Sequence, residues 1–245
     1  MLTGCIDVLD GWTPKVEDNG RTSLYTRKGY NAVNVQILGD HLKRILWLSD
    51  KYVGSTHDSP AFQDTELYRL LLANFRDLLE RMEYILADSA YSIRSFLQVP
   101  YPNTLPQTIE DIFNCYLSKA RIFSECVMGE LCSRWGIYQR RMHWELNKCR
   151  NVIRASAKIH NFLVDYREAH MIDVRDDFIS FEDAVPIFRD LGVDTKKNGR
   201  PTKEENEVTN LGIGLRKRLA NDLLNAGLVR GKDSRKRRKT YGRQN

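Results

Sequence analysis

The sequence lacks any long hydrophobic run, since no apolar stretch reaches the roughly 18 residues that a membrane-spanning helix requires. Its start, "MLTGCIDVLDGW", has no basic region and carries an acid at position 7, so we expect no signal peptide. The five cysteines form no CxxC pair and have no zinc-finger spacing. An odd cysteine count of this kind is typical of reduced thiols in an intracellular protein, and disulfides are not expected.

The composition is that of an ordinary globular protein. Of 245 residues, 42% are hydrophobic and 29% are charged, which suffices for one large domain or two small ones. The net charge of +6 is unevenly placed, because residues 230–243 hold eight basic residues and one acid, a charge of +7. The rest of the chain is near neutral at −1. The basic charge therefore belongs to a C-terminal tail, which we expect to be disordered.

The first fifty residues predict three strands. A short apolar strand, "LTGCID", is expected to end at Asp7. "NAVNVQIL" alternates apolar and polar residues, which predicts a half-buried strand. "RILWLS" resembles a return strand, so residues 31–49 are expected to form an antiparallel hairpin.

The remaining pattern is mainly helical, with one further strand. A strand is predicted over 84–88, followed by a short helical piece and "FLQVPYP". Residues 194–206 are expected to be a linker or loop. Helices are predicted over 59–82, 109–135, 144–166 and 215–228. This order predicts a mixed-sheet α/β domain, and it is also the order of the ribonuclease-H-like fold, although pattern alone leaves other α/β folds open.

Three acids are candidates for a metal site. Asp7 and Asp88 are expected at strand ends, and Glu125 within the helix 109–135. Asp88 could instead be a turn former, and Glu125 a surface partner of Arg121 one helical turn away. Carboxylates are also the hard oxygen ligands that hold the paired Mg²⁺ ions of phosphodiester-cleaving sites. Both interpretations remain open at this point.

Several segments, in this order, carry a resemblance to a known family: "GCID", "TRKGYNAVNVQILGD", "VGSTHDSPAF", "ILADSAY", "SKARIFSECVMGELCSRWGI" and "ASAKIHNFLVDY". Together they closely resemble the transposase domain of the PIF/Harbinger superfamily of DDE-type endonucleases and their domesticated relatives. The resemblance implies a ribonuclease-H-like fold with a mixed sheet flanked by helices. It also implies that Asp7, Asp88 and Glu125 are the catalytic residues and the ligands of Mg²⁺ or Mn²⁺.

Other residues of these segments have weaker assignments. Asp58 is expected to cap a helix or to support the metal ligands, with direct ligation as the alternative. His57 is expected to pack or to orient a neighbour, and His160 and Asn161 to be structural. Contacts with nucleic acid are assigned to the basic residues Arg27, Lys28, Arg121, Arg235, Lys236, Arg237, Arg238 and Lys239.

The chain also departs from the family pattern. Relatives usually have Gly-Thr-His after the first aspartate, whereas Asp7 is followed by Val8, Leu9 and Asp10. The N-terminal helical region that helps relatives to recognise DNA has no counterpart here. We therefore expect a catalytic domain over 1–166, a helical extension with a polar linker over 167–229, and a basic tail over 230–245.

Two functions follow from these observations. The first is a Mg²⁺-dependent endonuclease or transposase domain that cleaves DNA phosphodiesters by a two-metal mechanism. The second is a truncated or domesticated non-catalytic protein that binds DNA or protein. Both imply DNA as a partner, a nuclear location because of the Lys/Arg-rich tail, and a role for a separate DNA-binding partner protein.

Overall fold

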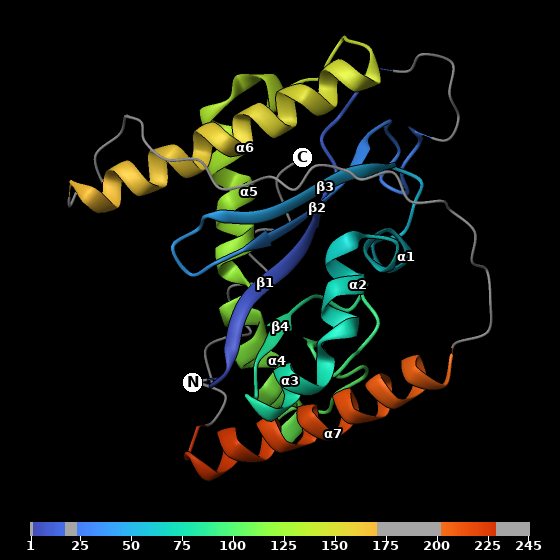
Figure 1. Cartoon of the computed structure of the whole chain (residues 1–245). Coiled ribbons are helices and arrows are strands. Elements are labelled where there is room, and N and C mark those ends of the chain that lie inside the picture. The colour runs from blue at the N-terminus through green and yellow to red at the C-terminus, as the bar shows by residue number, and fades with distance from the viewer. Residues whose placement is uncertain (1, 18–23, 171–201, 229–245) are drawn as a thin grey trace.

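A computed structural model describes residues 2–17, 24–170 and 202–228 of the chain, and its centre is a five-stranded mixed sheet (Figure 1). The strand order is β3-β2-β1-β4-β5. The first three strands pair antiparallel, and β4 and β5 run parallel to β1. The strands are β1 (Cys5–Trp12), β2 (Val33–Gly39), β3 (Ile45–Val53), β4 (Tyr84–Leu86) and β5 (Leu97–Gln98). The predicted ribonuclease-H-like mixed sheet and the predicted hairpin are confirmed.

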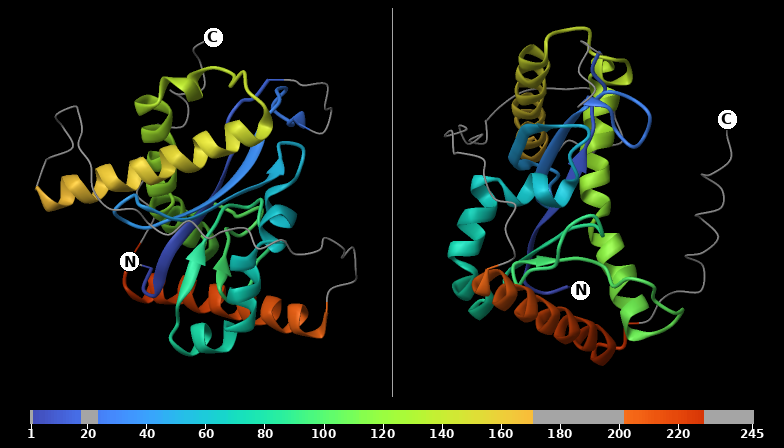
Figure 2. Two further views of the ribbon diagram at one scale, coloured as in Figure 1. Left: turned by 45° about the horizontal axis from the view of Figure 1, so that its top comes forward. Right: turned by 90° about the vertical axis from the view of Figure 1, so that its right-hand side faces the viewer.

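Helices cover both faces of this sheet. Side chains of α5 and α6 pack on the β2–β3 part of one face, and those of α1, α2 and α3 pack on the other. Figure 2 shows the long helix α7 running along one edge of the molecule. The helices are α1 (Asp58–Gln63), α2 (Glu66–Ala73), α3 (Phe75–Glu80), α4 (Ile109–Ala120), α5 (Ile122–Arg134), the 3₁₀ helix η2 (Gly136–Gln139), α6 (Leu146–Ala169) and α7 (Lys203–Asn225).

Two of the predicted long helices are interrupted. The expected helix over 59–82 is three short helices, because Thr65 and Asn74 serve as N-caps of new ones. The expected helix over 109–135 divides at Arg121, which ends α4 and begins α5. The short helical piece expected after β4 is not formed, since residues 87–96 make turns. Apolar spacing persisted across each break, so periodicity alone gave no sign of it.

Strand β1 is longer than predicted. It does not end at Asp7 but continues to Trp12, pairing with β2 on one side and β4 on the other. Side chains alternate across a strand, so Asp7 and Asp10, three residues apart, lie on opposite faces of the sheet. The strand end predicted at Asp7 was wrong, because an acidic residue inside a strand gives the same sequence pattern as one at its boundary.

The carboxylate of Asp7 lies in an unfavourable environment. Burial is the main cause that raises its pKa to about 7, and the negative charge of Asp40 raises it further. Asp40 itself pairs with Arg44 at 2.7 Å and accepts hydrogen bonds from the backbone N–H groups of Leu42 and Arg44. Asp7 is therefore held without a cation of its own, and its charged form is disfavoured.

Residues of α6 fasten the β2–β3 hairpin. The Asn161 side chain accepts from Ile45 N at 2.7 Å and donates to Ile45 O at 2.8 Å, replacing a missing strand partner. His160 Nε2 lies 2.8 Å from the Lys43 carbonyl oxygen, to which it donates. Both residues are fully buried, which confirms their predicted structural role.

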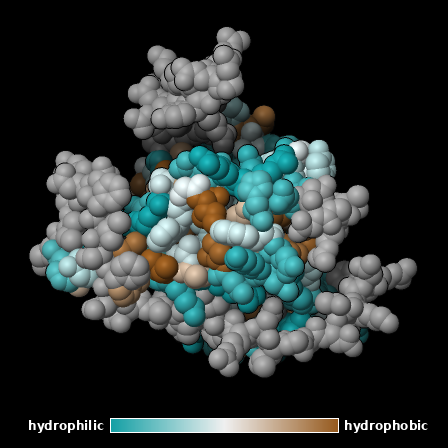
Figure 3. Space-filling view, turned by 90° about the horizontal axis from the view of Figure 1, so that it is seen from above, coloured by the Kyte–Doolittle hydropathy of each residue, from teal (hydrophilic) through white to brown (hydrophobic). Residues whose placement is uncertain are grey.

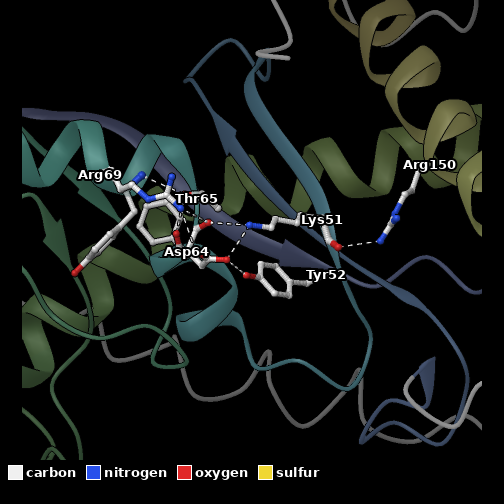
Figure 4. Close-up of polar contacts among 8 residues, drawn as sticks. Lys51, Tyr52, Asp64, Thr65, Arg69 and Arg150 are labelled. Carbon is white, nitrogen blue, oxygen red and sulfur yellow. Dashed lines mark hydrogen bonds and ion pairs between the residues drawn. The ribbon is translucent and has the colours of Figure 1, made fainter. Parts of the chain in front are cut away.

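A charged network connects the C-terminal part of the edge strand β3 to the end of α1 and to α2 (Figure 4). Asp64, which follows α1, accepts from Lys51 Nζ at 2.8 Å, from Arg69 at 3.1 Å and from the Tyr52 hydroxyl. Burial alone would raise the pKa of Asp64, but these hydrogen bonds together lower it. Asp64 is thus a fully paired structural carboxylate.

Helix α7 begins earlier than the sequence indicated. Thr202 and Glu205 form a reciprocal capping box at its start, so residues 202–206 belong to the helix and not to the expected linker. Residues 194–201 and the basic tail 230–245 lie outside the described residues. The helix packs on α4 and β5, and Val208 O accepts from Ser95 N at 2.9 Å.

The surface of the described residues carries only scattered apolar groups. On the face shown in Figure 3, hydrophobic residues form small patches among hydrophilic ones. Within the described ranges, no helix is both long and apolar enough to cross a membrane.

The contact between α7 and the loop before β5 depends on Gly212. A Cβ there would lie 2.4 Å from the Arg94 carbonyl carbon, whereas Gly214 on the same helix has open space. We expect Gly212→Ala to lower the free energy of unfolding by about 1–3 kcal/mol, because backbone must move to admit the methyl group. Gly214→Ala is the control and should stabilise the helix by roughly 0.5–1 kcal/mol. Urea denaturation measures both, and equal effects would contradict this packing.

The raised pKa of Asp7 predicts a pH-dependent effect on stability. Between pH 4 and 7 the folded state binds this proton more tightly than the unfolded state, so folding stability falls as pH rises through that window. Asp7→Asn removes the penalty, and the variant should be more stable than the parent by about 1–3 kcal/mol at pH 8, with little difference at pH 4. Denaturation at the two pH values measures this, and a destabilised variant at pH 8 would contradict it.

Candidate active site

The parallel pairing of β1 with β4 brings two aspartates together. Val8 is in register with Leu86, so Asp10 and Asp88, each two residues further on, follow the same face towards the same edge of the sheet. The negative charge of Asp10 is among the causes that raise the pKa of Asp88. Side chains at the carboxyl edge of parallel strands are where open α/β sheets place their ligands.

The charges of several side chains influence the pKa of Asp88. Burial is the largest influence and raises its pKa, and the negative charges of Asp10 and Asp58 add to this. The Ala90 N–H, which donates to Oδ1 at 2.7 Å, and the charge of Arg121 partly oppose the shift. Asp88 therefore forms the predicted turn and also lies among acids, so the two interpretations from the sequence are compatible.

Asp10 is held by the junction between α4 and α5. Its Oδ1 accepts from Gly11 N at 2.9 Å, and its Oδ2 accepts from Arg121 at 2.8 Å and from Ser124 Oγ at 2.9 Å. The break between the two helices at Arg121 delivers this guanidinium to the sheet edge. The expected surface pair of Arg121 with Glu125 is wrong, because Arg121 pairs with Asp10.

Asp58 reaches the same edge from the opposite face of the sheet. Its Oδ1 accepts from Asn34 Nδ2 at 3.0 Å and from Gln36 Nε2 at 2.9 Å. It begins α1, as predicted, but it is not the N-cap, a position held by His57. Its charge raises the pKa of Asp88. We call Asp10, Asp58 and Asp88 the acidic cluster.

A glycine permits the close approach of Asp58 to β1. A Cβ at Gly11 would lie 2.6 Å from Asp58 Oδ1, closer than any real contact allows. Any other residue at position 11 would require the Asp58 carboxylate to move from its present position. Gly11 thus sets the distance between two members of the acidic cluster.

Of the three acids predicted from the sequence, the structure brings only Asp88 into this cluster. Asp7 lies on the other face of β1 from Asp10, beside Asp40. Glu125 is exposed in the first turn of α5, next to Ser124, and forms no ion pair with any described residue. Gly129 lies one turn further along α5, and a Cβ there would meet no described atom within 4 Å.

The predicted basic residues near the cluster lie at its rim. Arg27 and Lys28 are exposed in a turn closed by a hydrogen bond from Thr26 N to Tyr30 O at 2.8 Å. The Arg27 guanidinium lies 2.6 Å from His57 Nε2, directly beside Asp58. Arg27 and Lys28 are both exposed, and only Arg27 contacts a residue next to Asp58 in sequence.

The donor set of the acidic cluster suits a hard divalent cation. Carboxylate oxygens are the ligands that Mg²⁺ and Mn²⁺ take, and Arg121 is the one cation that pairs with these three acids within the described ranges. In those ranges, however, no group of three or more His, Cys, Asp or Glu side chains is arranged to hold a metal ion. The Arg121 guanidinium occupies the side of Asp10 that a cation would otherwise approach.

Sequence reasoning missed Asp10, although a signal was present. Relatives usually have glycine directly after the first aspartate. In this chain Gly11 follows Asp10, whereas Val8 follows Asp7, so Asp10 matches that pattern better. The alternation around Asn34 and Gln36 predicted a half-buried strand, but all residues of β2 are buried because helices cover both faces. Their hydrogen bonds to Asp58 depend on the tertiary structure and cannot be read from the sequence pattern.

Two known proteins are similar to this chain over part of their length. The chain is 26% identical over 174 residues to "Protein ALP1-like" of Arabidopsis thaliana and 24% identical over 157 residues to "Putative nuclease HARBI1" of Mus musculus. These alignments cover 65% and 62% of the chain, and 42% of each relative, so the chain spans less than half of their length. No solved structure matches the chain.

A family model gives the most extensive match. The model described as "DDE superfamily endonuclease" matches residues 10–161, from Asp10 to Asn161. The matched stretch contains the whole acidic cluster and Glu125, and it leaves Asp7 outside. It covers more than half of the chain, and the protein therefore belongs to the DDE superfamily endonuclease family.

Proposed function

We propose that the protein is a divalent-metal-dependent endonuclease that cleaves DNA phosphodiesters, with Asp10 and Asp88 as its central acids. The observation that supports the proposal is the parallel register of β1 and β4, which pairs Val8 with Leu86 two residues before Asp10 and Asp88. Asp58 adds a third carboxylate from α1. Burial and the negative charges of Asp10 and Asp58 raise the pKa of Asp88, and a bound cation would offset those charges.

Each residue has a defined part in this proposal. Asp10, Asp58 and Asp88 would hold the cation, and Glu125, beside Ser124 on α5, is the further acid within reach of the same edge. A bound Mg²⁺ or Mn²⁺ supplies stabilisation of the attacking and leaving oxygens of a phosphodiester. Arg121 and Arg27 would position phosphate oxygens through charge-assisted hydrogen bonds. Asp7, which the resemblance assigned to the site, has no part in it.

A second function is favoured by the ion pair between Arg121 and Asp10. At 2.8 Å and largely buried, this pair already neutralises one acid of the cluster. A domain in which the pair is permanent would bind DNA or another protein without cleaving it. The two functions differ in whether a divalent cation can replace Arg121 beside Asp10.

The location and partners of the protein are part of the same proposal. DNA as the substrate accounts for the basic tail, whose eight basic residues stand within residues 230–243. A Lys/Arg-rich segment of this kind serves as a nuclear-import signal or as a nucleic-acid contact. A separate DNA-binding protein would supply the sequence recognition of the complex.

Metal binding tests the proposed site directly. We expect Asp10→Asn and Asp88→Asn each to weaken Mn²⁺ binding by at least tenfold, because a charged ligand is lost while the side-chain shape is kept. Asp7→Asn is the matched control and should leave Mn²⁺ affinity unchanged. Calorimetric titration gives the affinities, and nicking of supercoiled plasmid with Mg²⁺ or Mn²⁺ gives the activity.

The outcomes separate the alternatives. Loss of binding in Asp7→Asn but not in Asp10→Asn would restore the acid named by the resemblance and overturn the assignment of Asp10. A parent protein that binds Mn²⁺ and nicks plasmid supports the nuclease. No nicking and no Mn²⁺ binding by the parent protein would favour the non-catalytic function.

The tail is expected to dominate the salt dependence of DNA binding. Residues 230–243 carry +7, whereas the rest of the chain carries −1. Each neutralised phosphate contributes about −0.9 to the slope of log affinity against log salt. A chain ending at Leu228 should lose most of that slope and its nuclear accumulation, with Mn²⁺ affinity unchanged. Full retention of both by the shortened chain would show that the tail is only a solvated end.

A further inference from the structure

One segment ahead of the tail is far more basic than its surroundings. Residues 140–158 hold six basic residues and one acid, Glu145, which gives the segment a net charge of +5. Residues 1–229 together carry −1, so the part of that range outside the segment carries −6. The near-neutral charge of residues 1–229 is therefore the sum of a basic segment and an acidic remainder.

Most cations of this segment do not neutralise acids of the fold. Arg154 does, because it pairs with the buried Asp50 at 2.6 Å. The other five form no ion pair with a described residue, and all of them are exposed except one that is half-buried. We call these five the basic surface: Arg140, Arg141, Lys148, Lys158 and the half-buried Arg150.

The part of the basic surface that precedes α6 lies beside the chain that leaves β1. Met142 N donates to Lys15 O at 3.0 Å, and Glu17 N donates to Met142 O at 3.0 Å. The exposed Lys15 extends the positive charge, since its Nζ lies 5.1 Å from the ring centroid of Tyr30. The Tyr30 carbonyl closes the turn that holds Arg27. Positive side chains thus continue from the basic surface towards the rim of the acidic cluster.

Helix α6 brings the same surface to the end of β3, along which it lies (Figure 1). Arg150 Nη2 donates to Lys51 O at 2.8 Å, close to the C-terminal end of that strand. Strands β1 and β3 each pair antiparallel with β2, so both end at the same side of the sheet. Asp10 and Asp88 lie at that side. The basic surface and the proposed cleavage site therefore share one end of the sheet.

The spread of the cations and an exposed aromatic ring favour a nucleic acid as the ligand. Lys148 and Lys158 are ten residues apart on α6, about 15 Å along its axis, which exceeds the reach of a single small anion. A DNA duplex offers one phosphate charge per roughly 1.7 Å of its axis. Trp144 is 36% exposed with Lys148 Nζ 4.9 Å from its ring centroid, and exposed rings among cations are typical of nucleic-acid-binding surfaces.

We propose that the basic surface binds the phosphate backbone of duplex DNA next to the proposed cleavage site. The inference goes beyond the proposed function, because this binding requires neither a metal nor cleavage, and it rests on that function only for DNA as the polyanion. Contacts with phosphates position a duplex without reading its sequence. The domain therefore holds DNA through its own fold, in addition to any contact made by the tail.

The experiment compares two variants of the full chain that lose the same charge. The first replaces three cations of the basic surface: Arg140→Gln, Arg141→Gln and Lys148→Gln. The control replaces three exposed cations of α7, which packs on β5 at the opposite edge of the sheet from β3, and none of which forms an ion pair with a described residue: Lys203→Gln, Lys217→Gln and Arg218→Gln. Fluorescence anisotropy of a labelled duplex of arbitrary sequence gives the affinity over a range of salt concentrations, with EDTA present and with thermal unfolding recorded for each variant.

We expect the first variant to reduce the slope of log affinity against log salt by about 2–3, because each lost phosphate contact removes about 0.9. The control should keep the parent slope, and the tail contributes equally to all three proteins. An unchanged slope in the first variant, or an equal loss in both variants, overturns the inference. A parent protein that binds the duplex through this surface in EDTA but does not nick plasmid with Mg²⁺ supports the inference and contradicts the proposed cleavage.

Trp144 gives a local measurement that does not depend on charge. It is the most exposed of the four tryptophans, since Trp47 is buried and Trp12 and Trp135 are half-buried. Addition of the duplex should change the tryptophan fluorescence of the parent protein, and Trp144→Phe should lose most of that change while still binding the duplex. A fluorescence change of equal size in Trp144→Phe would mean that the duplex binds elsewhere, and it overturns the inference.

Discussion

The parallel pairing of β1 with β4 is the interaction on which the site depends. Because the register joins Val8 to Leu86, Asp10 on β1 and Asp88, two residues past the end of β4, come to the same edge of the sheet. A shift of one residue in either strand would send one carboxylate to the opposite face. The hydrophobic side chains around this pair, including Tyr84 and Leu86 at 0% exposure, hold the register in place.

Helices on both faces of the sheet contribute side chains to the sheet edge at which these aspartates lie. The α4–α5 junction supplies Arg121 and Ser124 to Asp10 on one face, and α1 supplies Asp58 over Gly11 on the other. Three carboxylates thus meet one guanidinium, which leaves excess negative charge at a partly buried place. Other acids of the fold are paired with cations, as Asp64 is with Lys51 and Arg69 and Asp50 is with Arg154 at 2.6 Å. The difference separates acids that stabilise the fold from acids that are available to a ligand.

Much of the architecture followed from the sequence because it depends on local pattern. Apolar alternation gave the hairpin of β2 and β3, and an apolar run stopped by an acid gave β4 and Asp88. The strand boundary predicted at Asp7 was wrong, because alternation fixes the face of a residue only when the strand boundary is known, and β1 continues through two aspartates. The breaks at Thr65, Asn74 and Arg121 and the full burial of β2 arise from tertiary contacts, which periodicity does not encode.

The close packing of α7 on the sheet has a consequence for how this domain can be inherited. The family match ends at Asn161, yet Leu215, Leu219 and Leu223 of α7 complete the hydrophobic core over Tyr84 and Leu86. A gene rearrangement that joined the matched region to a new partner without residues 203–225 would leave the β4–β5 side of the sheet without this cover. An uncovered sheet edge pairs readily with other chains, so such a recombinant would aggregate with every acid of the cluster still in its sequence. The unit that evolution can move intact is therefore longer than the region by which the family is identified.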